Sequence, residues 1–146
     1  MRKRRLHEGT TTVEFAIVAV ALFLLVFAIL EFSRVVFTMN LLQEGARRGA
    51  RVAAVVPKDD AAIKRAALYI GKGDTEVKML PALKNATVTT EYLDANGGTA
   101  GDYASIRYVR VSIAAGTLSL AVLPVVNFPL PVYTSTLPRE SLGVTQ

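Results

Sequence analysis

The sequence predicts an α+β protein: one long N-terminal helix, then a short helix and a small antiparallel sheet of about three strands. Three observations predict this fold class. Residues 15–30 are apolar without interruption. The apolar positions then recur with helical periodicity to about residue 55. The remaining sequence is rich in alternating and β-branched strand patterns, separated by turn residues. We therefore expect a helix over 10–56 and one small domain over 57–146.

A short cationic leader, residues 1–9, precedes the helix. Its basic residues are Arg2, Lys3, Arg4 and Arg5. The 146-residue chain has a net charge of +5, but only 13 basic and 11 acidic residues remain when the leader is set aside. The basic balance thus belongs to the leader, which argues against nucleic acid as a partner, since binding it requires a basic face on the folded domain. Basic residues beside an apolar run stay on the cytoplasmic side of a membrane.

The segment Phe15–Leu30 contains neither a charged nor an amide side chain. Its sixteen residues would rise roughly 24 Å as a helix. Short flanks extend it toward a hydrocarbon core of ~30 Å, so we expect a membrane span at about residues 13–33. Because the segment is apolar on all sides, lipid suits it better than the alternative, the core of a globular domain.

Beyond the span, the helix is predicted to continue without a break but to become amphipathic. Its apolar positions are Phe32, Val35, Val36, Met39, Leu41 and Leu42. Pro57 fits a stop just after its end. Glu31 and Arg34, three residues apart, can pair on the helix surface at the membrane edge. A plain interfacial salt bridge is the preferred interpretation of that pair.

Small residues gather near the end of this helix and predict a flat packing strip. Gly45 and Gly49 stand four residues apart, among several alanines, so another backbone can approach closely there. The strip suits a neighbouring subunit or the protein's own domain, and the sequence leaves both open.

The domain is predicted to begin with a short helix over 61–70, capped by Asp59 or Asp60 and ended by Gly71. Strands are expected over 86–93, 106–114 and 132–137, with a turn at 94–98. The apolar segment 118–130 is too short for a second membrane helix and contains Pro124 and Pro129.

A Gly–Thr step and a carboxylate at the edge of the apolar segment mark the start of the helix. Ordinary secretory signals are cut after the apolar core, but no small-residue site follows this one. Gly9 lies before the core, and a glycine lets a backbone lie extended in a protease cleft. A cut after Gly9 would place a new amine on Thr10, within one helical turn of Glu14. The alternative is an uncleaved signal anchor with Glu14 in the headgroup layer.

These residues resemble a known family. Gly9-Thr10-Thr11-Thr12-Val13-Glu14-Phe15 looks like a prepilin peptidase site, and residues 2–56 are similar to TadE-like minor pilins (pseudopilins) of tight-adherence pili. The C-terminal TSTLPRE also resembles the closing strand of that family. The resemblance implies a pilin-like helix and a single-pass bacterial inner-membrane protein with a cytoplasmic N-terminus and a periplasmic domain.

The resemblance also implies partners and a role. The partners would be a prepilin peptidase that removes residues 1–9, other pilins or pseudopilins, the inner-membrane assembly platform and the membrane itself. The role would be structural, in pilus assembly or initiation: the mature helix would join a filament or help to start one. An uncleaved, membrane-anchored periplasmic binding or scaffold protein is the alternative.

Catalytic and cofactor chemistry finds little support in the sequence. There is no cysteine, and the single histidine, His7, lies in the leader. We therefore expect no enzyme, no cofactor and no metal site based on histidine or thiolate. Glu91, Asp94 and Asp102 flank a glycine-rich turn, where a hairpin explains them better than a calcium ion does.

Overall fold

The computed structural model describes residues 6–56, 58–71, 83–121 and 127–139. Its long helix is α1 (Leu6–Val55), and its short helix is α2 (Asp60–Ala67). The strands are β1 (Thr87–Leu93), β2 (Tyr108–Ala114), β3 (Thr117–Ser119), β4 (Asn127–Pro129) and β5 (Tyr133–Pro138), with a short 3-10 helix, η2 (Tyr103–Ser105), before β2. The α+β class predicted from the sequence is confirmed.

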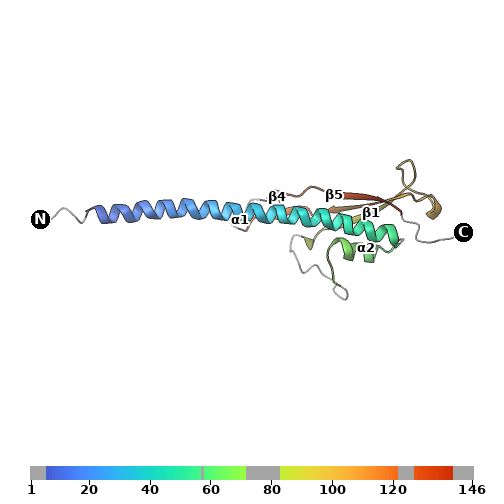
Figure 1. The fold of residues 1–146 in the computed structure, drawn as a ribbon, viewed down its shortest axis with the longest axis horizontal. Helices are drawn as coiled ribbons and strands as arrows, with labels where there is room; N and C mark the ends of the chain where they lie inside the picture. The colour runs from blue at the N-terminus through green and yellow to red at the C-terminus, as the bar shows by residue number, and fades with distance from the viewer. Residues whose placement is uncertain (1–5, 57, 72–82, 122–126, 140–146) are drawn as a thin grey trace.

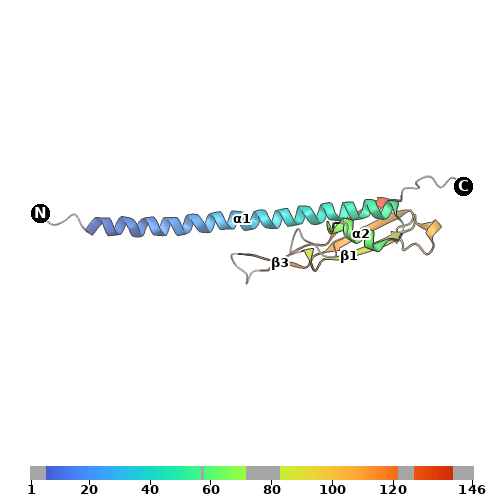
Figure 2. The same ribbon diagram turned by 90° about the horizontal axis from the view of Figure 1, so that it is seen from below.

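The elements after α1 gather along its C-terminal half, and its N-terminal half projects alone (Figures 1 and 2). Strands β1, β2 and β5 form an antiparallel sheet in the order β1-β2-β5. Strands β3 and β4 form a separate two-stranded hairpin in which Leu118 lies opposite Phe128. The predicted sheet of about three strands is therefore joined by a small hairpin.

The core lies between the C-terminal half of α1, the central strand β2 and α2. Along β2, alternate residues Val109, Val111 and Ile113 are buried, as a half-buried strand requires. On α1, Leu42, Ala46, Ala50 and Ala53 are buried at helical spacing. Two different periodicities thus meet in one core, and each is visible in the sequence.

Helix α2 begins as predicted but ends earlier. The Asp59 carboxylate accepts a hydrogen bond from the backbone N–H of Ala62 at 2.9 Å, which makes Asp59 the N-cap. The helix ends at Ala67, and Tyr69 takes a left-handed backbone with φ of 56°. The prediction that Gly71 ends the helix is therefore wrong, because Tyr69 reverses the chain two residues before it.

Helix α1 begins at Leu6, four residues before the predicted start. Gly9 alone does not interrupt it, since one interior glycine costs only about 1 kcal/mol. Several predicted features lie outside the described residues: the basic residues 2–5, the stop at Pro57, Pro124 and Glu140 of the TSTLPRE segment.

Candidate functional site: the exposed half of the long helix and its junction with the domain

The N-terminal half of α1 presents apolar side chains to the outside on every face. Phe15 is 73% exposed and Phe32 is 70% exposed, and none of the most apolar window is buried in the protein. This is the one helix of the described residues that is long and apolar enough to cross a membrane. A globular core would have buried these side chains, so the core-helix alternative is wrong for this segment.

Glu14 and Thr10 lie one turn apart on this exposed half, and both are exposed. Glu14 is the one ionisable residue of α1 between Thr10 and Leu30. Gly9 and Thr10 are themselves helical. A protease that needs an extended backbone at this step would first have to unwind this end, and helix ends open at little cost in free energy.

Glu31 and Arg34 mark the junction between the exposed half and the domain. Arg34 Nη1 lies 3.1 Å from Glu31 Oε2, so the predicted pair forms. Both side chains also hold the β3–β4 hairpin. Glu31 Oε1 accepts a hydrogen bond from the Ala121 N–H at 2.8 Å, and Arg34 Nη2 donates one to the Ser119 carbonyl at 3.2 Å. The pair is thus more than the plain salt bridge preferred from the sequence.

An apolar groove runs between the hairpin and α1 just beside this pair. Its volume is about 530 Å³. It is lined by Leu24, Phe27, Ala28, Glu31, Phe32, Val35, Val36, Met39, Leu120 and Phe128. We call it the hairpin groove. No sequence signal indicated it, because its two walls come from segments about ninety residues apart along the chain.

Gly45 and Gly49 lie against the protein's own domain. A Cβ atom at Gly45 would collide with the carbonyl oxygen of Ala67, and one at Gly49 would lie 3.0 Å from the Ala67 Cβ and 3.1 Å from Val111 Cγ1. Of the two partners that the sequence left open for the strip, this structure brings α2 and β2 against it.

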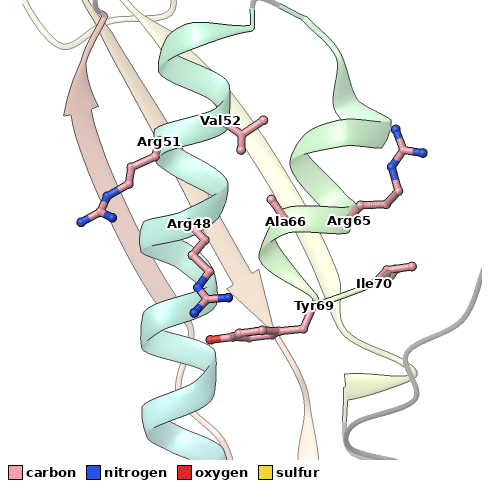
Figure 3. Close-up of a pocket in the computed structure, with 7 residues that line it drawn as sticks. All are labelled: Arg48, Arg51, Val52, Arg65, Ala66, Tyr69 and Ile70. Atoms are coloured by element: carbon pink, nitrogen blue, oxygen red, sulfur yellow. The ribbon is translucent and has the colours of Figure 1, made fainter. Parts of the chain in front are cut away.

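A second groove, of about 540 Å³, lies between α1 and α2. It is lined by Arg48, Arg51, Val52, Arg65, Ala66, Tyr69 and Ile70. Figure 3 shows Arg48 over the ring of Tyr69, with Arg51 and Arg65 pointing away on opposite sides. The Arg48 guanidinium carbon is 4.7 Å from the ring centroid, and its Nε is 3.2 Å from Glu44. The floor is apolar and the rim is cationic.

Two tyrosines of the domain have shifted pKa values. Burial raises the pKa of Tyr69, against the opposing effect of the Arg48 cation. Burial also raises the pKa of Tyr92, although the Lys58 N–H that donates to its hydroxyl lowers it. Both phenols therefore stay protonated at neutral pH. Tyr69 uses its proton structurally, donating to the Leu41 carbonyl at 3.1 Å.

The acidic residues around the glycine-rich turn have partners within the protein. Asp94 Oδ1 accepts hydrogen bonds from the N–H groups of Asn96 and Gly98, at 2.9 and 2.8 Å. Asp102 caps η2, and Glu91 lies 3.3 Å from Arg110 across the sheet. Within the described residues, no three or more histidine, cysteine or acidic side chains gather where they could hold a metal ion.

Comparison with known proteins agrees with the resemblance drawn from the sequence. The family model described as "TadE-like protein" matches residues 9–51, which covers most of α1 and no part of the domain. The expected resemblance to this family is confirmed over that segment. Neither the curated proteins nor the solved structures include a match to the chain.

Proposed function

We propose that this chain, TadE-like over residues 9–51, is a minor pilin-like structural subunit of a tight-adherence pilus, with a role in pilus assembly or initiation. The observation that carries the proposal is the exposed apolar half of α1, whose most apolar window is not buried by any of the described residues. Such a helix is both an anchor in lipid and a surface for packing against neighbouring helices. The role is structural rather than catalytic.

Processing at Gly9–Thr10 is the second part of the proposal. A prepilin peptidase would remove residues 1–9 and leave a cationic amine on Thr10. That amine would lie one helical turn from Glu14, close enough to pair with it in the same chain or in a neighbouring subunit. A carboxylate in an apolar helix generally has such a partner, because burying it in lipid alone costs about 2.5–3.5 kcal/mol at the helix centre.

The proposed location is the bacterial inner membrane, crossed once. The four basic residues of the leader favour a cytoplasmic N-terminus, so the α/β domain over 57–146 would lie in the periplasm. The proposed partners are the prepilin peptidase, other pilins or pseudopilins and the inner-membrane assembly platform.

The mass of the intact protein tests the processing step. The full-length chain is expressed with and without a prepilin peptidase, extracted from membranes and weighed by mass spectrometry. We expect a loss equal to residues 1–9 only with the peptidase. A matched Gly9→Leu variant should stay at full length, because a large side chain cannot occupy the position that glycine fills. A full-length wild-type chain in the presence of active peptidase would refute the processing proposal.

A second candidate is an uncleaved, membrane-anchored binding or scaffold protein. The observation that favours it is the groove between α1 and α2, which offers three arginines around an apolar floor. That chemistry suits an acidic segment of another protein. Two results together would favour this candidate over the pilin role. The chain would keep its full-length mass in the presence of the peptidase, and the Arg51→Ala and Arg65→Ala substitutions would abolish binding of a partner protein.

A further inference from the structure

The hairpin of β3 and β4 lies along α1 where the apolar run ends (Figures 1 and 2). Ser119 contacts Arg34, and Ala121, two residues later, contacts Glu31. From Ser119 to Ala121, the chain therefore runs back along α1 toward the exposed apolar half. Of the described parts of the domain, strands β3 and β4 lie nearest to the proposed membrane span.

The hairpin groove reaches into the proposed span. A span that begins at Val13 and crosses ~30 Å ends near residue 33. Leu24 then lies roughly 13 Å inside the membrane boundary, and Phe27 roughly 9 Å inside it, at 1.5 Å per residue. Leu120 and Phe128 line the same groove as these two residues. Leu120 lies between Ser119 and Ala121, which contact Arg34 and Glu31, so the hairpin meets the groove at about the proposed membrane boundary.

Two backbone groups of the hairpin have side-chain partners on α1. Peptide groups in a membrane require hydrogen-bond partners from the protein itself. On the side facing α1, the Ala121 N–H is satisfied by Glu31 and the Ser119 carbonyl by Arg34. Glu31 is the one ionisable residue lining the groove, and its carboxylate is engaged by Arg34 and Ala121.

We propose that β3 and β4 rest against the headgroup–acyl boundary of the leaflet nearest the domain, and that phospholipid acyl chains fill the hairpin groove. Lipid is the occupant because the groove continues directly onto the exposed apolar surface of α1, where Phe27 is 43% exposed and Phe32 is 70% exposed. Phe128, at 39% exposed, completes this surface from the hairpin side. The domain is thereby docked on the membrane by two elements. This inference rests on the membrane span of the proposed function.

Tryptophan fluorescence tests the proposal, since the chain contains no tryptophan. The full-length Phe128→Trp variant is reconstituted in phosphatidylcholine vesicles whose acyl chains carry bromine near the headgroup. We expect a blue-shifted emission that loses about half of its intensity to the bromines, because side chains of interfacial elements reach ~5–10 Å into the acyl boundary. Leu120→Trp provides a second reporter in case Phe128→Trp does not fold.

The controls separate this inference from the span itself. Tyr108, on β2, is 41% exposed, which is close to the exposed fraction of Phe128. The Tyr108→Trp variant should keep its fluorescence intensity with brominated lipid. Phe23→Trp, in the span, should be quenched most strongly by bromine near the chain ends.

Quenching of Phe23→Trp without quenching of Phe128→Trp or Leu120→Trp would overturn the hairpin proposal and leave the span intact. Blue-shifted but unquenched hairpin reporters would mean that protein, such as a second copy, covers the groove, and would also overturn it. An unquenched Phe23→Trp would refute the span and this inference together.

Discussion

At the scale of the residue, Glu14 carries the most specific chemistry of the exposed helix. Its carboxylate is the one ionisable group in α1 between Thr10 and Leu30, on a surface that otherwise suits lipid. The apolar run alone supplies the free energy of insertion. The carboxylate makes the packing of this helix more specific, since it favours a cationic partner at one position on an otherwise apolar surface.

We predict that Glu14→Ala leaves membrane insertion intact but weakens co-purification with other pilins. Removal of the carboxylate lowers the cost of insertion, yet it also removes the partner of the Thr10 amine. Glu14→Gln, which keeps the size of the side chain, should behave like the alanine variant, whereas Glu14→Asp should retain most of the partners. Quantitative pull-down from membrane extracts measures this. If Glu14→Ala and Glu14→Gln recovered as much pilin as the wild type does, that result would count against the pairing.

Gly45 is required by close packing inside the chain. We predict that Gly45→Ala destabilises the domain by about 1–2 kcal/mol, because overpacking against the Ala67 carbonyl outweighs the roughly 1 kcal/mol of helix propensity that alanine gains. Gly101→Ala is the matched control, since an added Cβ there meets nothing within 4 Å. Thermal unfolding of the full chain in detergent measures both. A Gly45→Ala variant as stable as the wild type would contradict the packing described above.

At the scale of the element, the hairpin depends on α1 for its order. A two-stranded hairpin is marginally stable alone, and β3 and β4 pair over only three residues each. The buried side chains Leu118 and Leu130 join the hairpin to the main core, and Glu31 with Arg34 fixes its outer end. The junction therefore couples the membrane half of α1 to the domain.

We predict that Glu31→Ala loosens the hairpin. The Ala121 N–H loses a charge-assisted hydrogen bond, of the kind that contributes about 1.5–3 kcal/mol, so its amide should exchange with solvent roughly tenfold faster or more. Glu44→Ala is the control, because it removes another glutamate–arginine pair of α1 that touches no part of the hairpin. Hydrogen exchange followed by mass spectrometry reports both. Unchanged exchange near Ala121 in Glu31→Ala would show that packing alone holds the hairpin.

The elements also show what a sequence can predict here. The apolar run, the 3.6-residue period of α1 and the alternation of β2 are local signals, and each led to an element that the structure contains. The contact of Glu31 with Ala121 joins residues 90 positions apart. No local pattern encodes such a contact. The sequence therefore predicts the pair of Glu31 with Arg34 but not its contacts with the hairpin. The sequence predicts the end of α2 too late, at Gly71. The reason is that Tyr69 takes a left-handed backbone, which tyrosine rarely adopts.

At the scale of the whole molecule, one helix serves two environments. Its C-terminal half is the spine of a small domain, and its N-terminal half is left bare. The match to the TadE-like family covers the bare half and extends to Arg51, into the half that packs on the domain. A protein of this form presents an apolar surface that other membrane helices can reach, as the proposed role in filament assembly requires.

Site-specific photocrosslinking from the bare half of α1 tests this central claim most directly. A photoreactive residue replaces Phe23 in the full-length chain, in cells that carry the tight-adherence assembly genes, and adducts are identified by mass spectrometry. We expect adducts with pilins that carry a prepilin leader, and their loss when those genes are deleted. The same residue in place of Tyr108, on the domain, is the control for chance capture. Adducts to lipid alone at Phe23, with assembly active in the same cells, would contradict the account.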